Sequence, residues 1–277
     1  MNFKLESLLT VAASALLVGT LITSCKDTEY PTPQPVTTAP NTSARVLFAN
    51  ATGDATALTA YLENLPVGSA LALGQATNYV TVPYLGSLQL RVKGVGGTLG
   101  ANDLSNKSTV AANGAYTVFV TDSINRPVVR NAANLITDVG GARLSFVTDP
   151  LTQTLTAGSG GVRFFHFVAD AGLPASSTAT TPLALSVRLS NVNSTSATAI
   201  TPFNGRVYRN VATTAFTSVP AGTYLVEVVT GATAPTSGTV SAITSTTLTV
   251  EAAKLYTLYA QGLARRRTVS VGRIQHN

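Results

Sequence analysis

The sequence predicts an all-β protein built from two tandem antiparallel β-sandwich domains. First, apolar and polar side chains alternate, as where Leu88, Leu90 and Val92 are separated by Gln89 and Arg91. A strand sends successive side chains to opposite faces, so a period of two indicates one buried and one solvated face. Second, Gly, Pro, Asn and Asp recur at roughly ten-residue intervals, as turns between short strands do. Third, blocks of sequence repeat in the same order along the chain.

The chain begins with an uncharged apolar run at residues 8–22, preceded by Lys4 and followed by small residues. This run is shorter than the ~20 apolar residues that span a bilayer. Its length and its flanking residues are typical of a secretion signal. We therefore expect residues 1–24 to be a signal peptide.

Cys25 is the only cysteine among the 277 residues. Ile22-Thr23-Ser24-Cys25 resembles a bacterial lipobox, which implies cleavage before Cys25 and acylation of that residue. The alternative is an ordinary signal peptide followed by a chance cysteine. Each buried methylene contributes ~0.8 kcal/mol, so two or three acyl chains on Cys25 would hold the protein at a membrane. Without a second thiol there is no intrachain disulfide, and the core alone must stabilise the fold.

The residues after Cys25 predict where the protein is displayed. KDTEY, residues 26–30, resembles the surface-export signal of Bacteroidetes-type lipoproteins; the alternative is a solvated cluster of charges. We expect an outer-membrane protein that faces the cell exterior, although the leaflet stays open. Residues 25–43 are rich in proline, which fixes φ and removes a hydrogen-bond donor. This composition predicts an extended tether.

Internal repeats set the expected domain boundaries. Residues 108–120 align without gaps on 248–260, and residues 44–55 align more loosely on 161–172. Residues 79–94 align on 216–231 with one extra residue before Gly86. The repetition predicts a first domain at 44–155 and a second at 161–277, with residues 151–161 as the connector. We expect about six to eight strands in each domain, and no helix after the signal peptide.

Each copy resembles domain-of-unknown-function family 4397, which opens with a V-R-F-x-H strand followed by Asp-Ala. Val162-Arg163-Phe164-Phe165-His166 and Asp170-Ala171 carry this opening. In the first copy Phe48 aligns with His166, which leaves Asp54-Ala55 two residues later than expected.

Later motifs extend the resemblance over nearly all of residues 44–277. The family's mid-domain Val-Pro-Ala-Gly-Thr-Tyr occupies residues 219–224 and degenerates at 82–86. Its late Tyr-Thr pair recurs at Tyr116-Thr117 and Tyr256-Thr257. The resemblance implies an immunoglobulin-like sandwich and a secreted or surface location, and it implies no activity.

Few residues could carry catalysis or bind a metal. His166 is the only internal candidate base, and a triad also needs an activated hydroxyl and an orienting acid. We expect it to be a hydrogen-bonded strand histidine near the sandwich edge, and we expect the penultimate His276 to fray. Asp54, Asp149 and Asp170 are interpreted as turn caps, with calcium ligation as the alternative. The sequence predicts no metal and no cofactor.

Two further motifs have plain structural interpretations. KGVGGTLG, residues 93–100, has Leu99 where a dinucleotide-binding loop needs its third glycine, so a flexible hairpin or bulge is expected. Tyr116 and Tyr256 occupy matching positions in the two copies. We interpret them as tyrosines that tie a sandwich corner, with a sugar or cofactor platform as the alternative.

The formal net charge is +6, and three arginines stand together at Arg265, Arg266 and Arg267. They are expected at a hairpin tip, where they could bind an anionic polysaccharide, lipid head groups or nucleic acid; a solvated turn is the alternative. At least one is expected to point away from the others. Nucleic acid is not an expected partner, because no aromatic residues interleave with the arginines. Asp122-Ser123-Ile124 resembles the Bacteroidetes O-glycosylation sequon, which makes Ser123 a candidate modification site.

Together these features predict a non-enzymatic surface lipoprotein with a role in binding, adhesion or envelope structure. Its expected partners are the membrane, through the lipid anchor, and a cell-envelope glycan or another surface protein. One alternative is an accessory protein in polysaccharide capture. A second alternative is a hydrolase, which would need His166 beside a carboxylate in a pocket, and the sequence gives no sign of such a constellation.

Overall fold

The structure is a computed structural model that describes residues 43–55, 57–82, 86–94, 104–138, 140–173, 182–193 and 199–277. Residues 42–277 form one compact unit. The predicted signal peptide, Cys25 and nearly all of the predicted tether lie outside the described residues. Within the described part of the chain, no helix is both long enough and apolar enough to cross a membrane.

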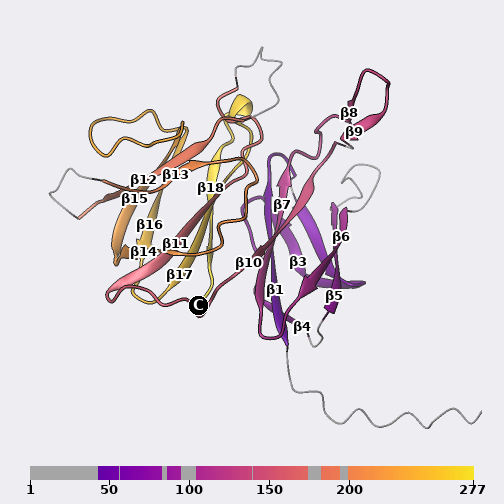
Figure 1. Cartoon of the computed structure of the whole chain (residues 1–277), viewed down its shortest axis with the longest axis horizontal. Coiled ribbons are helices and arrows are strands. Elements are labelled where there is room, and N and C mark those ends of the chain that lie inside the picture. Colours follow the sequence, from indigo (N-terminus) through magenta and orange to yellow (C-terminus); the bar gives the residue numbers. More distant parts are fainter. Residues whose placement is uncertain are drawn as a thin grey trace, which may run out of the picture. The chain divides into compact units, whose positions relative to one another are not determined.

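The first half of the unit is a two-layer sandwich (Figure 1). One sheet has the strand order β10-β7-β1-β4 and the other the order β3-β2-β5-β6. A separate hairpin, β8-β9, is inserted between β7 and β10. The strands are β1 Ala44–Thr52, β2 Ala57–Leu62, β3 Leu65–Ala72, β4 Val80–Val82, β5 Gly86–Gly94, β6 Leu104–Val110, β7 Ala115–Asp122, β8 Val129–Arg130, β9 Ile136–Asp138 and β10 Arg143–Thr148.

The second half repeats this arrangement strand for strand. Its sheets have the orders β14-β11-β17-β18 and β13-β12-β15-β16. A short 3-10 helix, η1, stands where the first half carries the β8-β9 hairpin. The elements are β11 Ser159–His166, β12 Leu185–Asn191, β13 Ile200–Arg206, β14 Thr217–Pro220, β15 Gly222–Thr230, β16 Thr244–Val250, β17 Leu255–Gln261, η1 Ala264–Arg266 and β18 Ser270–Gln275. The predicted all-β sandwich fold is confirmed, and β11 begins inside the expected connector 151–161.

The sandwiches are not antiparallel throughout, which corrects the predicted architecture. β1 pairs in parallel with β7, with Val46 opposite Tyr116, and β11 pairs in parallel with β17, with Val162 opposite Tyr256. A parallel pair needs a long crossover connection, and strands of the opposite sheet supply it in both halves.

The same pairing corrects the alignment of the two opening strands. Val46 and Val162 both lie opposite the matching tyrosine, so Asn50, and not Phe48, occupies the place of His166. The predicted alignment is therefore wrong by two residues. A shift of two preserves which side chains face inward, so the apolar pattern could not detect it. With the observed register, Asp54 matches Asp170 without a gap.

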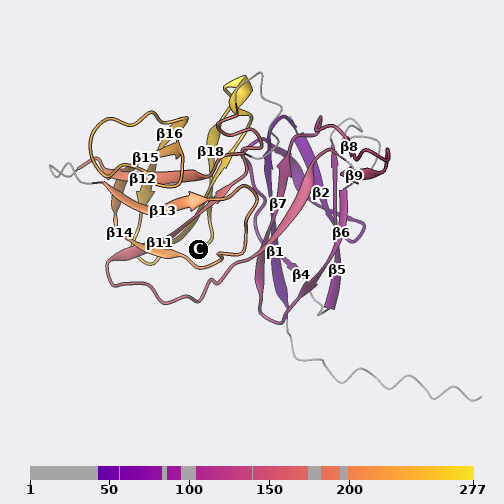
Figure 2. The same cartoon turned by 45° about the horizontal axis from the view of Figure 1, so that its top comes forward.

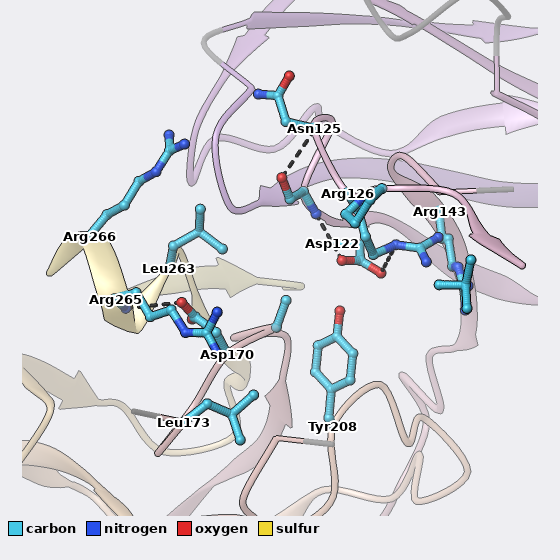
Figure 3. A pocket seen from close by; sticks show the side chains of 14 residues that line it. Asp122, Asn125, Arg126, Arg143, Asp170, Leu173, Tyr208, Leu263, Arg265 and Arg266 are labelled. Atoms are coloured by element: carbon cyan, nitrogen blue, oxygen red, sulfur yellow. Dashed lines mark hydrogen bonds and ion pairs between the residues drawn. The ribbon is translucent and has the colours of Figure 1, made fainter. Parts of the chain in front are cut away.

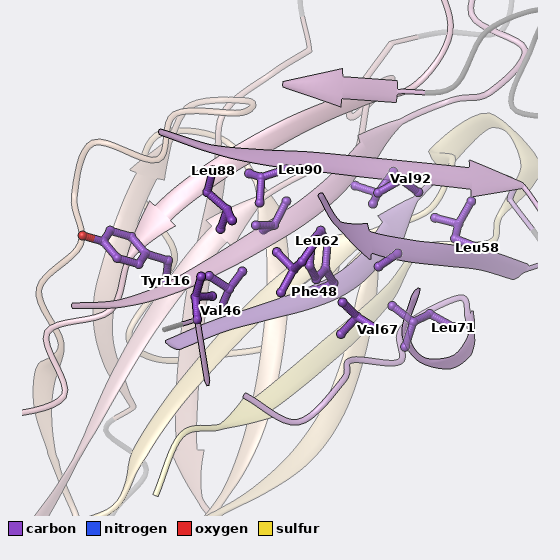
Figure 4. Packing of buried hydrophobic residues seen from close by; sticks show 14 of the residues in the cluster. Val46, Phe48, Leu58, Leu62, Val67, Leu71, Leu88, Leu90, Val92 and Tyr116 are labelled. Carbon is purple, nitrogen blue, oxygen red and sulfur yellow. The ribbon is translucent and has the colours of Figure 1, made fainter. Parts of the chain in front are cut away.

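Each sandwich has its own apolar core, made by the inward residues of both layers. In the first, Leu88 and Leu90 of β5 point toward Val46 and Phe48 of β1 (Figure 4). The predicted alternation holds in β5, where inward residues are buried and their neighbours are partly exposed. Burial of apolar area at about 25 cal/mol per Å² is what stabilises a disulfide-free sandwich.

Four strands break that alternation, because β1, β7, β11 and β17 are buried on both faces. Their outward residues form a third apolar cluster together with Val147, Phe167 and Ile274. In this cluster the Phe119 ring lies 4.9 Å from that of Phe167 and 5.1 Å from that of Tyr259, measured between centroids. The outer faces of the two sandwiches thus pack against each other (Figure 2). The expectation of one solvated face per strand is wrong for these four strands, because the other sandwich covers the outer face of each.

A buried ion pair lies at this junction between the sandwiches. The Arg163 guanidinium of β11 pairs with the Asp149 carboxylate, which follows β10, and the Arg163 side chain is only 2% exposed. Arg163 also donates to the carbonyls of Thr148 and Thr214, each at 3.0 Å, and stacks over the ring of Phe216 at 4.6 Å. A buried charge needs this many partners, because each lost water contact must be replaced.

The pair belongs to a closed ring of hydrogen bonds. Tyr79 donates its hydroxyl proton to Asp149 at 2.7 Å, so Nδ1–H of a neutral His276 donates to the Tyr79 oxygen at 2.6 Å. Thr257 then donates to His276 Nε2 at 2.6 Å. The Arg163 Nε–H donates to Thr257 at 2.8 Å, which closes the ring. Every donor in the ring faces one acceptor, so the ring fixes both the tautomer of His276 and the junction.

We expect Arg163→Met to lower the free energy of unfolding by about 3–5 kcal/mol, because it leaves Asp149 buried without its counterion. Urea denaturation of the two proteins measures the difference. The matched control combines Arg163→Met with Asp149→Asn, which removes both charges and should recover part of the loss. A single variant as stable as the parent chain would contradict the role given to the ion pair.

Candidate functional site

A pocket of about 660 Å³ opens where loops of both sandwiches meet (Figure 3). From the first sandwich come Asp122 at the end of β7, the loop after it, and Arg143 at the start of β10. From the second come the loop after β11, Tyr208 after β13, and η1. The remaining lining residues are Ser123, Asn125, Arg126, Pro127, Val129, Ala169, Asp170, Leu173, Leu263, Arg265 and Arg266.

Two equivalent aspartates hold the loops that form the pocket. The Asp54 carboxylate accepts from the backbone N–H of Ile124 at 2.8 Å and from the Ser123 hydroxyl at 2.6 Å. The Asp170 carboxylate accepts from the backbone N–H groups of Ala264 at 2.6 Å and Arg265 at 2.9 Å. Both act as caps for the turn that follows the parallel partner strand, which is the interpretation that the sequence favours.

The described residues offer no group of three or more His, Cys, Asp or Glu side chains that could hold a metal ion.

Arginine dominates the charge of the pocket. Four arginines and two aspartates line it, which leaves an excess of two positive charges. Arg126 pairs with Asp122 at 2.9 Å and also donates to the carbonyl of Gly141 at 3.1 Å. Arg209 lies behind the wall and donates to Thr121 at 3.3 Å. Burial lowers the pKa of Arg209, and the nearby charge of Arg143 lowers it further.

Tyr208 gives the pocket a neutral hydroxyl. Its oxygen is buried and makes no hydrogen bond of normal geometry with the described residues. Burial raises the pKa of Tyr208, and the neighbouring Asp122 carboxylate raises it further, so the phenol stays protonated at neutral pH. Its ring packs edge-on against His166, at 5.5 Å between centroids. The hydroxyl points toward Asp122 (Figure 3).

The three consecutive arginines lie in the loop of the hairpin that β17 and β18 form, as the sequence predicts. Residues 264–266 make the 3-10 turn η1, and Arg267 ends it in the left-handed region at φ 55°. Arg265 and Arg266 line the pocket, whereas Arg267 is exposed outside its lining. The sequence therefore identified two of the residues that line the pocket, but it did not predict the 3-10 turn that positions them.

Other sequence-predicted positions have varied outcomes. The Ser123 hydroxyl donates to Asp54 and accepts from the N–H of Asn125 at 3.1 Å, so glycosylation there would break a cap; the modification stays a prediction. Cys25 and residues 95–100 of the glycine-rich stretch lie outside the described residues.

Tyr116 and Tyr256 accept hydrogen bonds from the backbone N–H groups of Ala111 at 2.8 Å and Glu251 at 3.3 Å, respectively. These bonds confirm that both tyrosines tie corners.

His166 is a structural residue. Its side chain is fully buried, and Nδ1 accepts from the N–H of Val168 at 3.2 Å. Nε2 therefore carries the proton and donates to the carbonyl of Leu183 at 3.1 Å. Burial lowers the pKa of His166 to about 4, so it is neutral at physiological pH. Asn50 does the same work in the first sandwich, where it accepts from Thr52 at 3.2 Å and donates to Leu71 at 3.1 Å.

The expectation that His276 frays is wrong. Its backbone N–H donates to the carbonyl of Leu255 at 3.0 Å, and its ring is held by Tyr79 and Thr257. Burial lowers the pKa of His276 to about 4, although the Asp149 charge opposes that shift. His276 is ordered because its imidazole makes two of the hydrogen bonds at the junction between the sandwiches.

Sequence reasoning missed Arg126, Arg143 and Tyr208. They come from segments separated by up to 82 positions, and only the packing of the two sandwiches brings them to one pocket. None lies in a motif or in a repeated block.

No protein-family model and no curated protein matches the chain. The resemblance to domain-of-unknown-function family 4397 therefore stays a prediction. Among solved structures, the chain is similar to one described as a "putative cell adhesion protein" from Bacteroides eggerthii. That similarity has 12% sequence identity and a TM-score of 0.21, and it covers 86% of this chain and 96% of the other.

Acid should destabilise the fold through its two buried histidines. Their pKa values are lowered to about 4, so their contribution is complete above the ordinary histidine pKa of 6.5 and is lost as pH falls through 4. Each accounts for roughly 3 kcal/mol of that loss. His166→Asn, which copies Asn50, should fold and should show a weaker decline between pH 6.5 and 4 in urea denaturation. An unchanged pH profile would show that His166 does not titrate on unfolding.

Asp170→Ala should lower the free energy of unfolding by about 1–3 kcal/mol, because two backbone N–H groups lose their acceptor. Asp170→Asn keeps one acceptor oxygen and should lose less. Urea denaturation ranks the three proteins, and Asp54→Ala provides the matched change in the first sandwich. If Asp170→Ala is as stable as the parent, the carboxylate does not hold η1.

Proposed function

We propose that this chain is a lipid-anchored outer-membrane protein that faces the cell exterior and recognises a ligand without transforming it. The position of the pocket carries this proposal. β1 and β7 run in parallel, with Arg45 beside Ala115 and Thr52 beside Asp122. The chain enters β1 at one end of the sandwich, and the pocket lies at the other. Nine residues of strand span roughly 26 Å, so a chain anchored at Cys25 enters far from the pocket.

The chemistry around the pocket supports binding over hydrolysis. Its described lining contains neither histidine nor cysteine. The Asp170 carboxylate is held by two backbone N–H groups, and the Asp122 carboxylate by Arg126. His166 lies behind Tyr208 as a neutral imidazole, and each of its two ring nitrogens makes a hydrogen bond. A general base must reach the proton that it removes, and none of these groups is placed to do so.

A second candidate function is accessory capture of polysaccharide at the cell surface. The arginines of the pocket favour it, since guanidinium groups pair with anionic oxygen atoms in a fork geometry. This candidate differs from adhesion in its partner, which is a soluble or loosely held glycan. An envelope glycan or another surface protein is the partner in the leading proposal.

The lipid anchor and the exposure of the protein can be tested together. In cells that make Cys25→Ser, we expect the protein to leave the membrane fraction, because its acyl chains are lost. The parent chain should stay with the outer membrane and react with a specific antibody on intact cells.

A matched control adds Ser43→Cys to Cys25→Ser, which restores a thiol at the wrong place and should not restore anchoring. A parent chain that reacts only after cells are opened would contradict outward display. Membrane retention of Cys25→Ser would contradict the anchor.

A further inference from the structure

We propose that the pocket between the two sandwiches binds an acidic saccharide, whose carboxylate or sulfate oxygens pair with the guanidinium groups of Arg265 and Arg266. The inference rests on the proposed function, because it names the ligand class of that recognition site. Four observations support it: the charge of the pocket, the chemistry of its walls, a buried hydroxyl without a hydrogen bond of normal geometry, and the position of the pocket on the molecule.

The charge of the pocket favours an anion that is held by arginine. Arg265 and Arg266 project from η1 on one side, and Arg126 and Arg143 lie on the other (Figure 3). The Arg266 side chain is exposed and makes no ion pair or hydrogen bond with the described residues. A guanidinium presents two parallel donors that match a carboxylate or sulfate, so it favours such groups over neutral ones.

The pocket has room for a small ligand, and its walls are partly apolar. A volume of about 660 Å³ lies within the ~300–1,000 Å³ typical of small-molecule sites. Leu173, Leu263 and Pro127 line it between the arginines. Apolar walls pack against the carbon–hydrogen faces of a sugar ring, while arginines at the margins bind its charged substituents. A small inorganic anion would leave these walls uncovered.

Tyr208 supplies a polar contact for a sugar hydroxyl. Its buried oxygen lacks a partner of normal geometry, and such a group costs about 1–3 kcal/mol. A ligand hydroxyl that donates to this oxygen, or accepts from it, recovers that cost when it binds. The same contact is of no use to a lipid chain.

The place of the pocket argues against lipid head groups and nucleic acid. It lies at the Asp122 end of β7, opposite the end where the chain enters at Ala44. Head groups of the anchoring membrane would meet the other end of the sandwich. Tyr208 is the only aromatic residue in the described lining, and its ring is packed against His166. Binding of single-stranded nucleic acid uses several stacking rings.

The test uses the full chain purified from membranes in detergent. Isothermal titration measures its affinity for three oligosaccharides of equal length: tetragalacturonate, a sulfated galactotetraose and neutral galactotetraose. We expect one or both acidic ligands to bind, with affinity that falls as salt is added, and the neutral ligand not to bind. The two acidic arms decide between carboxylate and sulfate as the recognised group.

Variants locate the site. Arg265→Ala combined with Arg266→Ala should weaken binding by about tenfold or more, since charge-assisted hydrogen bonds are lost. Arg267→Ala is the matched control, because it removes an arginine of the same turn that lies outside the pocket, and it should change affinity by less than about twofold. Tyr208→Phe should give a smaller loss than the double variant. Melting temperatures confirm that each variant is folded.

Three results would overturn the inference: equal affinity for the neutral ligand, no binding of either acidic ligand, or an equal loss in Arg267→Ala. Stronger binding to anionic lipid vesicles or to single-stranded DNA would also overturn it. Surface labelling of intact cells and the behaviour of Cys25→Ser are independent of these titrations. If the titrations contradict the acidic-saccharide proposal, the proposal of an anchored, outward-facing protein still stands, and only the proposed ligand class is rejected.

Discussion

The buried pair of Arg163 and Asp149 is the interaction on which the arrangement of the two sandwiches depends. Two β-sandwiches that meet through flat apolar faces can slide, because dispersion contacts carry little directional information. Asp149 accepts hydrogen bonds from Tyr79, Thr117 and Arg163. From Tyr79 the hydrogen bonds continue through His276 and Thr257 back to Arg163. These hydrogen bonds can all form in only one relative position of the two sandwiches. They therefore fix how the two halves meet, and with it the shape of any site that both halves line.

The two halves share a set of structural devices and differ where the pocket forms. Each half has a parallel strand pair, a corner tyrosine and an aspartate that caps the turn after the pair. Asn50 and His166 make the same pair of hydrogen bonds with different side chains. Each accepts from a backbone N–H two residues further on and donates to a backbone carbonyl. Beyond the capped turns the copies diverge: the first inserts the β8-β9 hairpin, and the second makes η1 with its arginines. Recognition is proposed at this divergence, because equivalent loops with unequal side chains meet there.

The buried titratable groups and the exposed ones have separate tasks. His166, His276 and Tyr79 are neutral and bonded within the protein, and burial is the first cause of each pKa shift. Their N–H and O–H groups make hydrogen bonds within the protein, and these bonds stabilise the fold. The charged groups that line the pocket are mainly arginines. Guanidinium groups pair with anionic oxygen atoms, and this chemistry is the basis of the binding function that is proposed.

The sequence by itself determined the fold class, the duplication, the corner tyrosines and the caps at Asp54 and Asp170, because each depends on local chemistry or on the period of two. It also found Arg265 and Arg266, since three consecutive arginines are visible without a structure. Only the tertiary structure decided that β1, β7, β11 and β17 are buried on both faces, that Arg163 and His276 are junction residues, and that Arg126, Arg143 and Tyr208 line a pocket. The physical reason is that strand patterning records whether a face is covered, and it does not record what covers it. The second sandwich is a remote segment, so its contacts become known only when the whole chain is packed.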